Sequence, residues 1–267
     1  MHAERVKITI NNQIATVTLN RTDKKNAFDM PMFWALHAAQ KTLRNNRSIR
    51  VIILTANGED FSTGLDIKQI LSNRLSAIRL LWKWLPGNAN LAQRVVYDWQ
   101  KIPVPVICAI QGRCYGAALQ IALGCDFRIA ATDSELAIME AKWGLIPDMA
   151  GNLGLHANVA LDQAMRLAMA AQIIDANHAK QLGLISEISD APLARAEHFA
   201  NELCQTSPDA LGGIKKLYHG LWNSKSRRLL AKETYYQWKI LLGKNQRQAV
   251  YAQSKKELAR FEQRLRW

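Results

Sequence analysis

The segment PVPVICAIQGRCYGAALQIALG, residues 103–124, places a strand, a tight loop and a helix in direct succession. The apolar run PVPVICAIQG predicts a buried strand that ends at Gly112, and YGAALQIALG predicts a helix rich in small residues. An earlier segment has the same shape: RVIILTANG, residues 50–58, predicts a buried strand, and the loop EDFSTGLD leads into a short helix. A repeated strand–loop–helix unit is typical of an α/β fold.

The segments on either side extend this pattern. VKITINN and IATVTLN alternate apolar and polar residues around a short polar turn, which predicts a hairpin. Pro31 is well placed for the first turn of the helix predicted for MFWALHAAQKTLRNN. FRIAATDSELAIM predicts further strands, and almost everything after Asn152 predicts helices. The chain should therefore fold as an α/β core over residues 1–200 and a helical region over residues 201–267.

Residues 72–90 stand apart from this regular pattern. Their hydrophobic periodicity is weak, and they include the turn sequence Leu-Pro-Gly, so we expect a mobile flap. Trp82 and Trp84 lie in this segment. They would supply a bulky apolar wall for a pocket, unless they simply cover the core.

Composition limits the class of protein. The 267 residues are 49% hydrophobic and 21% charged, which is ordinary for a soluble protein with a sizeable core. The first residues lack the apolar stretch of a signal peptide, and no apolar run approaches the roughly 20 residues that cross a bilayer. We therefore expect a cytoplasmic protein with no membrane partner. The four cysteines have no C-x-x-C spacing and the six histidines are scattered, which favours buried thiols in a reducing compartment and no metal site.

The net charge of +13 is concentrated near the C-terminus. Residues 205–267 hold 14 Lys and Arg against 4 Asp and Glu, which is +10 of the total. These side chains either form solvated helix faces or attract an anionic partner. Nucleic acid, an acidic membrane surface and a phosphate-rich small ligand all fit the charge, which cannot choose among them.

The backbone N–H groups at two predicted helix starts could bind a negatively charged oxygen. The first N–H groups of a helix have no acceptor within the helix, and a preceding glycine lets a ligand oxygen approach them closely. The candidate donors are the N–H groups of Leu65, which follows Gly64, and Ala117, which follows Gly116. Two such groups facing each other would stabilise an oxyanion. Glycines that open helices are also common packing devices, so spacing alone leaves both interpretations open.

The segment MEAKWGLIPDMAG, residues 139–151, places Glu140 and Asp148 among apolar and backbone-bending residues. In one interpretation both acids point outward from a surface loop and Lys142 neutralises one of them. In the other they carry proton chemistry in a pocket. A glutamate partly desolvated by Met139 and Trp143 should have a raised pKa, which helps it to exchange a proton near neutral pH.

Four segments in order, NRTDKKNAF, NGEDFSTGLDIK, IQGRCYGAALQIALGCDFRIA and EAKWGLIPDMAG, resemble the crotonase (enoyl-CoA hydratase/isomerase) superfamily. The resemblance covers almost the whole chain, including the closing FEQRLRW. It implies an α/β fold built as a crotonase-like spiral of ββα units, with a helical C-terminal trimerisation region. It also implies a homotrimer, or a hexamer made of two trimers.

The resemblance also assigns roles to residues. It implies that an acyl-CoA thioester binds with its carbonyl in an oxyanion hole between the backbone N–H groups of Leu65 and Ala117. The family usually has glycine at the second position, but alanine still offers its N–H. Glu140 falls on the family's catalytic glutamate. CoA is part of the substrate, and no covalent cofactor or metal is implied. The positions implied for substrate or CoA binding are Lys25, Ala27, Ser62, Gly64, Asp66, Ile67, Lys68, Gly116, Phe261 and Arg264.

The chain departs from the family pattern at two acidic positions. The family's hydratases hold a water between two glutamates, but Gln120 stands at the second position here. An amide can position a water but cannot accept its proton; alternatively, Gln120 only satisfies a neighbour in the core. The spacing of Glu140 and Asp148 resembles the dienoyl-CoA isomerases, whose further acid this chain lacks. Asp148 either joins the chemistry or caps a helix or turn.

These residues favour three functions in decreasing order. The first is double-bond migration in an enoyl-CoA, with Glu140 as proton shuttle and Asp148 tuning it or taking a second proton. The second is hydration by Glu140, with Gln120 orienting the water. The third is RNA binding by the basic C-terminal helices, whose aromatic residues are Tyr218, Trp222, Tyr235, Tyr236 and Trp238. Their helical spacing favours packing over base stacking, so we do not expect a nucleic-acid partner.

Overall fold

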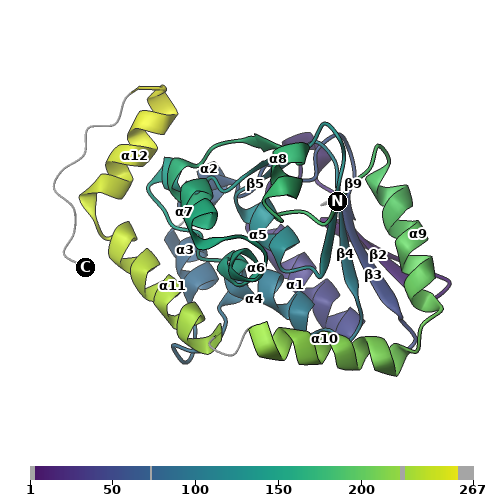
Figure 1. The fold of residues 1–267 in the computed structure, drawn as a ribbon. Helices are drawn as coiled ribbons and strands as arrows, with labels where there is room; N and C mark the ends of the chain where they lie inside the picture. The colour runs from purple at the N-terminus through teal and green to yellow at the C-terminus, as the bar shows by residue number, and fades with distance from the viewer. Residues whose placement is uncertain (1–3, 73, 223–225, 258–267) are drawn as a thin grey trace.

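The computed structural model of the chain describes residues 4–72, 74–222 and 226–257 (Figure 1). In this part of the chain no helix is long and apolar enough to cross a membrane. The helices that frame the molecule are α1 (Met30–Asn45), α4 (Leu91–Lys101), α7 (Leu161–Ala170), α8 (Ala176–Gln181), α9 (Pro192–Cys204) and α10 (Pro208–Trp222).

The larger sheet has the strand order β1-β2-β3-β4-β6-β9. Its strands are β1 (Val6–Asn11), β2 (Ile14–Leu19), β3 (Val51–Ala56), β4 (Val106–Ile110), β6 (Phe127–Ala130) and β9 (Glu187–Ile188). β1 and β2 are antiparallel, and the remaining pairs are parallel. The turn residues Asn12 and Gln13 both have positive φ, at 48° and 68°, as in the tight turns that match strand twist. The predicted hairpin and the two predicted buried strands are confirmed.

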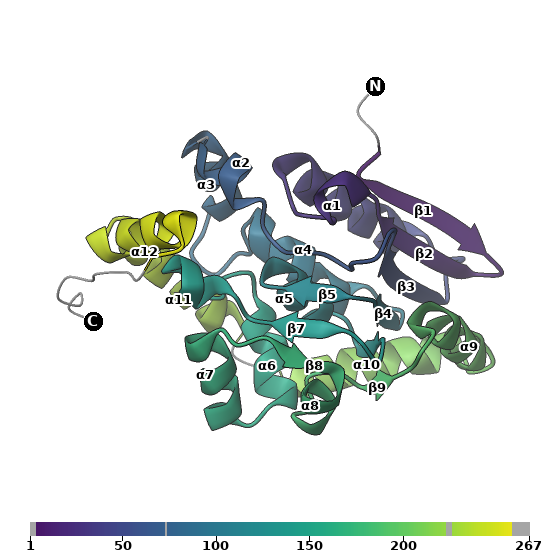
Figure 2. The ribbon, with the colours of Figure 1, turned by 90° about the horizontal axis from the view of Figure 1, so that it is seen from above.

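The central strands are apolar on both faces because each face is covered. In β3, Ile52 and Leu54 belong to the main core, whereas Val51 and Ile53 pack with Ala196 and Ala200 of α9. Figure 2 shows α9 lying along the sheet, away from α1 and α4. Burial on both faces explains why RVIILTANG reads as a continuous apolar run and does not alternate.

A smaller sheet holds the segments that build the pocket described below. Its order is β5-β7-β8, from β5 (Arg113–Tyr115), β7 (Glu135–Ala137) and β8 (Ile174–Asp175). β5 leads directly into α5 (Ala117–Leu123), and β7 is soon followed by the 3-10 helix η2 (Glu140–Trp143) and by α6 (Gly151–Asn158). The helix predicted after Gly64 is α2 (Ile67–Ser72). Both predicted strand–loop–helix units are therefore present.

The C-terminal helices α11 (Ser226–Leu241) and α12 (Lys244–Lys255) lie along one side of the core, and α12 packs against η2 (Figure 1). A Cβ at Gly144 would lie 2.9 Å from the Cβ of Ala249, so α12 approaches this turn too closely for a larger residue. The boundary predicted at residue 200 stays a prediction; α9, which packs on β3 and β4, runs across that position.

The segment predicted as a flap contains a helix, α3 (Arg74–Leu81). Trp82 and Trp84 do not form a pocket wall, because they are 65% and 84% exposed. Leu80 and Leu81 at the end of α3 line the pocket in their place. Sequence could not separate these residues, since all four are large and apolar and the periodicity is weak.

Candidate active site

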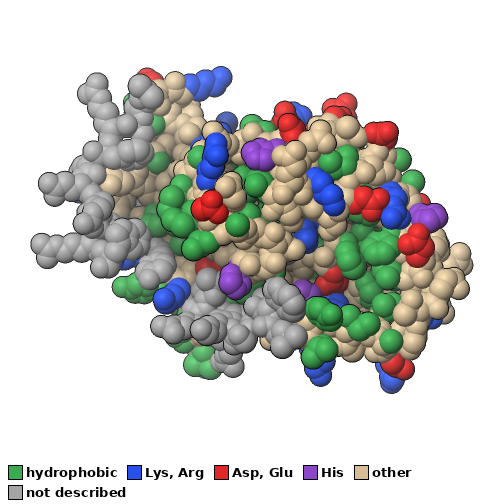
Figure 3. Space-filling view, in the orientation of Figure 1, with side chains coloured by type: hydrophobic (Ala, Val, Ile, Leu, Met, Phe, Trp, Pro, Cys, Tyr) green, Lys and Arg blue, Asp and Glu red, His purple; other side chains and the backbone are tan. Residues whose placement is uncertain are grey.

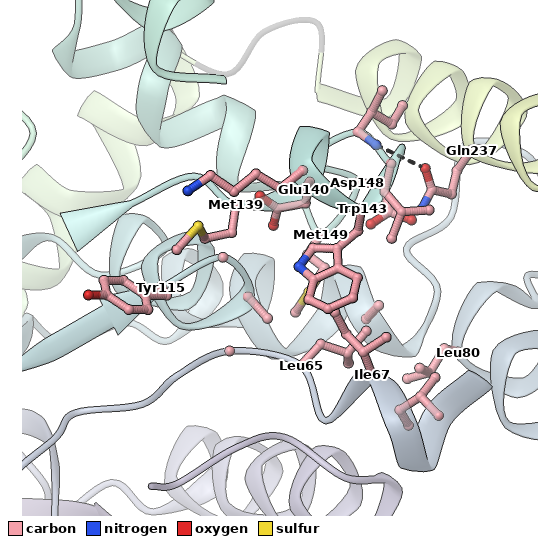
Figure 4. Close-up of a pocket in the computed structure, with 18 of the residues that line it drawn as sticks. Leu65, Ile67, Leu80, Tyr115, Met139, Glu140, Trp143, Asp148, Met149 and Gln237 are labelled. Atoms are coloured by element: carbon pink, nitrogen blue, oxygen red, sulfur yellow. Dashed lines mark hydrogen bonds between the residues drawn. The ribbon is translucent and has the colours of Figure 1, made fainter. Parts of the chain in front are cut away.

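A cavity of about 420 Å³ lies between the loop before α2, the start of α5, η2 and the C-terminal helices. Figure 4 shows Glu140 and Asp148 on its walls, with Leu65, Ile67 and Leu80 across from them. Gln237 and Leu241 of α11 and Gln253 of α12 also line it. The chain's own C-terminal helices thus close one side of the cavity.

The loop at Leu65 is held with its N–H pointing away from the neighbouring strand. Phe28 and Leu65 form an isolated parallel bridge, in which Phe28 N–H donates to Gly64 O at 2.8 Å and Asp66 N–H donates to Phe28 O at 3.0 Å. In this pattern the N–H of Leu65 itself faces the other side. The fully buried hydroxyl of Ser62 fixes the turn by donating to Asn26 O at 2.8 Å and accepting from Gly64 N–H at 3.1 Å.

The two glycine-opened segments meet in space. Gly64 has φ +87°, and a Cβ there would lie 2.6 Å from Tyr115 O and 3.4 Å from Ala117 N. The second segment therefore passes directly against the first. Ala117 begins α5, so its N–H has no acceptor within the helix. Gly116, with φ +51°, lies beside Glu140: a Cβ there would be 3.6 Å from Glu140 Oε1.

Glu140 lies at the start of η2 and faces α5. Gln120 Nε2 donates to its Oε1 at 2.5 Å, while its Oε2 is shielded from solvent and has no hydrogen-bond partner among the described residues. Burial raises the pKa of Glu140 above its ordinary value, and the hydrogen bond from Gln120 partly opposes that shift. The carboxylate is thus oriented at one oxygen and free to exchange a proton at the other. The surface-loop interpretation of Glu140 is not what the structure shows.

Gln120 is 1% exposed, and its oxygen is committed to the backbone. Its Oε1 accepts from Met149 N–H at 3.0 Å and from Gly151 N–H at 3.4 Å. The side chain of Gln120 therefore links Glu140 to the turn that follows Asp148. The close packing of Gly151 on Gln120, where a Cβ would lie 2.7 Å from Cγ, keeps this arrangement rigid.

Asp148 lines the same cavity and is 9% exposed. Burial raises the pKa of Asp148 well above its ordinary value, and the nearby carboxylates of Glu233 and Glu140 add to the shift. Two acids in one pocket whose pKa values are both raised are suited to acid–base work. Asp148 does not cap α6, because α6 begins at Gly151 with Ala150 at its N-cap.

Sequence reasoning missed a further carboxylate near Asp148, that of Glu233 of α11, which is 3% exposed. It accepts hydrogen bonds from Gln93 Nε2 and Asn152 Nδ2, both at 2.9 Å, and from Ala150 N–H at 3.1 Å. Burial raises the pKa of Glu233 to about 7. In the sequence, Glu233 follows a lysine in a basic helix, so the pattern resembles a solvated face; α11's partners were needed to find it.

The residues implied for CoA binding differ in how exposed they are and in whether they line the cavity. Lys25 and Lys68 are exposed, Ala27 is half-buried and Ile67 lines the cavity. Asp66 accepts from Arg21 at 2.9 Å and from Gln69 N–H at 3.2 Å, which ties the start of α2 to the preceding loop. Phe261 and Arg264 lie outside the described residues. These CoA assignments stay predictions.

The other sequence-based expectations concern thiols, metals and aromatic residues. Cys108, Cys114 and Cys125 are buried free thiols, as predicted, but Cys204, at the end of α9, is only half-buried, so the prediction was wrong for that residue. Tyr218 and Tyr235 are 55% and 61% exposed, whereas Trp238 is half-buried. The side chains of Trp222 and Tyr236 lie outside the part of the chain that can be described. No group of three His, Cys, Asp or Glu residues suited to a metal occurs within residues 4–72, 74–222 and 226–257.

Comparison with known proteins agrees with the geometry. The chain is 28% identical over 208 residues to the mitochondrial methylglutaconyl-CoA hydratase of Mus musculus, covering 75% of the chain and 64% of that protein. It is 30% identical over 220 residues to the carnitinyl-CoA dehydratase of Salmonella typhi, covering 81% and 80%. The structure matches that of an enoyl-CoA hydratase/isomerase from Pseudoalteromonas atlantica T6c with a TM-score of 0.85 at 23% identity, covering 97% and 100%.

These matches differ in extent. Those to the mammalian methylglutaconyl-CoA hydratases span about three fifths of the length of these proteins, 59% to 64%. The sequence pattern of the family described as enoyl-CoA hydratase/isomerase matches residues 9–264, which is nearly the whole chain. The fold agrees with that pattern. The chain therefore belongs to the enoyl-CoA hydratase/isomerase family, the crotonases.

Proposed function

We propose that the chain is an acyl-CoA enzyme that moves the double bond of an enoyl-CoA by proton transfer. Glu140 removes a proton from C2 of a 3-enoyl-CoA through its unpartnered Oε2. The resulting charge moves to the thioester oxygen, which the N–H groups of Leu65 and Ala117 stabilise. The proton then returns at C4, from Glu140 or from Asp148. No atom is gained or lost, so the product is the 2-enoyl isomer.

The observation that carries this proposal is the hydrogen bonding of Gln120. Its oxygen already accepts from Met149 and Gly151, and one of its N–H groups is bound to Glu140. Only one amide hydrogen remains for a water, and no acceptor remains to orient it. Gln120 therefore suits the role of holding Glu140, and a water held between two carboxylates is not supported.

The apolar cavity walls agree with an acyl substrate. Leu80, Leu81 and Ile70 face the interior, together with Phe33 and Ile146. A cavity of about 420 Å³ is of the size that small ligands occupy. The charged CoA portion suits a basic chain. CoA belongs to the substrate in this proposal, and the chemistry uses the chain's own residues.

Hydration is the second candidate, because two of the relatives above are named as a hydratase and a dehydratase. In that case Glu140 alone would activate a water that the remaining Gln120 hydrogen orients. The two functions differ in net chemistry, since hydration adds water across the bond and isomerisation does not.

Incubating the purified chain separately with a 3-enoyl-CoA and a 2-enoyl-CoA decides between them. We expect the 3-enoyl thioester to convert to the 2-enoyl isomer without a gain of mass, measured by chromatography with mass spectrometry. In ²H₂O the product should carry deuterium at C4 when the transferred proton exchanges with solvent. Clean formation of the 3-hydroxyacyl product from the 2-enoyl thioester, with no isomerisation, would favour hydration.

We also propose that the chain forms a trimer or a hexamer of paired trimers. Leu161, Met165 and Met169 of α7 are 77%, 45% and 69% exposed, and their spacing puts them on one helix face. Figure 3 shows hydrophobic side chains gathered at α7. A second copy of the chain is the occupant that a crotonase implies; this face on α7 lies before residues 201–267, the region to which the resemblance assigned the subunit contacts. Light scattering should give three or six times the chain mass, and a Met169→Lys variant should dissociate; a monomeric wild-type chain would contradict this.

A further inference from the structure

The turn between Asp148 and α6 has an unusual backbone. Ala150 adopts φ +69° and ψ 6°, the left-handed region, which is sterically disfavoured for a residue with a Cβ. Such a conformation persists only where the surroundings hold it. Side chains from two helices bind the backbone N–H groups of this turn. Met149 and Gly151 donate to Gln120 of α5, and Ala150 donates to Glu233 of α11 at 3.1 Å.

Glu233 also accepts hydrogen bonds from two side chains, those of Asn152 in α6 and Gln93 in α4. Asn152 Nδ2 donates to Glu233 Oε1 at 2.9 Å and to Pro147 O at 2.7 Å, so it connects the carboxylate to the residue before Asp148. Gln93 Nε2 donates to Glu233 Oε2 at 2.9 Å. The backbone on both sides of Asp148 is thus connected to one buried carboxylate.

We propose that Glu233 is a positioning residue of this active site: together with Gln120 it holds the 149–151 turn and thereby fixes Asp148 in the cavity. The proposal rests on the isomerase function above, in the form in which Asp148 rather than Glu140 returns the proton at C4. Glu233 is not among the residues that line the cavity. It acts through the turn, through Asn152 and through its charge.

Charged groups from two segments act on Glu233: Lys83 from the loop after α3 and Asp148 from the turn. Lys83, in the loop after α3, donates to Leu230 O at 2.8 Å and to Gln93 Oε1 at 3.1 Å. Burial lowers the pKa of Lys83 to about 8, while Glu233 and Asp148 oppose the shift. Asp148 comes from the turn, and Glu140 of η2 acts on Asp148. The neutral neighbours are Gln93 of α4, Asn152 of α6 and Asn90 at the N-cap of α4. Lys83 is thus a cation that acts on Glu233.

The sign of the coupling follows from these groups. Ionised Glu233 raises the pKa of Asp148, so it keeps Asp148 protonated to higher pH. Without that charge Asp148 should lose its proton at lower pH, and isomerisation that needs protonated Asp148 should fail sooner as the pH rises. A group with only a structural role would lower the rate equally at every pH.

The experiment compares the pH dependence of kcat in wild type and Glu233→Gln, with Glu197→Gln as matched control. Glu197 is exposed on α9 and makes no contact with the cavity. kcat is measured from about pH 5 to about pH 9. We expect the alkaline limb of the kcat profile of Glu233→Gln to lie about one pH unit below that of wild type, while KM changes little. The control should follow wild type. An unmoved limb in a folded Glu233→Gln protein overturns the proposal.

A second measurement does not depend on activity or on the variant's folding. In wild type, the ¹³C-carboxyl resonance of Asp148, assigned with Asp148→Asn, should respond to the titration of Glu233 near pH 7. An Asp148 resonance that ignores this titration overturns the proposal. The wild-type chain could show the coupled titration yet isomerise no enoyl-CoA. That result would contradict the proposed function but support the link between Glu233 and Asp148.

Discussion

Replacing Glu140 by glutamine should lower kcat for double-bond migration about a thousandfold, the middle of the range of about 10² to 10⁴ that one acid–base group contributes. The variant keeps the size of the side chain and one oxygen for Gln120 Nε2, which now lies 2.5 Å from Glu140 Oε1. It removes the group that accepts the proton, because an amide is not basic at useful pH. Steady-state rates with a 3-enoyl-CoA measure kcat, and KM should change little.

Stability and a control separate this loss from unfolding. Burial raises the pKa of Glu140, so this group lowers stability as the pH rises from the ordinary pKa of a glutamate to the raised value, and the full loss remains above it. Glu140→Gln should therefore have a melting temperature equal to or above that of wild type at neutral pH. Glu59→Gln, at an exposed site, should keep full activity. Undiminished activity in Glu140→Gln or Glu140→Ala would show that the proton passes through another group.

Replacing Gly64 by alanine should lower kcat by about a hundredfold or more, because it displaces both proposed oxyanion donors together. The new Cβ would lie 2.6 Å from Tyr115 O, a backbone atom that cannot move without its chain. The φ of +87° also disfavours any residue with a side chain. The loops must separate, which carries the N–H of Leu65 away from that of Ala117.

Gly213→Ala is the matched control for this variant. Gly213 lies inside α10, and a Cβ there meets nothing within 4 Å. That substitution should leave kcat unchanged and raise stability by up to about 1 kcal/mol, since alanine favours helix. Gly64→Ala should lose some stability, measured by urea unfolding, but remain folded. A folded Gly64→Ala enzyme with wild-type kcat would remove Leu65 and Ala117 from the mechanism.

Local pattern predicted the parts of the fold whose periodicity is strong. The hairpin, the buried strands β3 and β4, and the helix that follows Pro31 all form as expected. The close approach of Gly64 to Tyr115 and Ala117 could not be predicted from glycine spacing alone, which left a packing role open; only the family resemblance placed these two segments together. The structure of residues 72–90 was harder to predict, because the hydrophobic periodicity of α3 is ambiguous. The two tryptophans of this segment are large and apolar like core residues, although they are exposed.

The site was predictable where function depends on neighbours in sequence. Glu140 and Asp148 share one apolar segment, so their placement in a cavity could be expected from the sequence. The orientation of the Gln120 amide could not, because it depends on the backbone of residues 149–151. Glu233 and Lys83 were missed for the same reason: their burial is decided by helices that lie far away along the chain.

The hydrogen bonds of Glu233 have a consequence for the order of folding. Its three donors belong to residues that precede it by 140, 83 and 81 positions. During synthesis, Ala150 and its neighbours therefore emerge long before the helix that satisfies them. Closing loops of this length costs chain entropy, so such contacts form late. The core can collapse early, but the turn after Asp148 reaches its final form only when α11 has docked, and catalytic competence is then among the last properties that the nascent chain acquires.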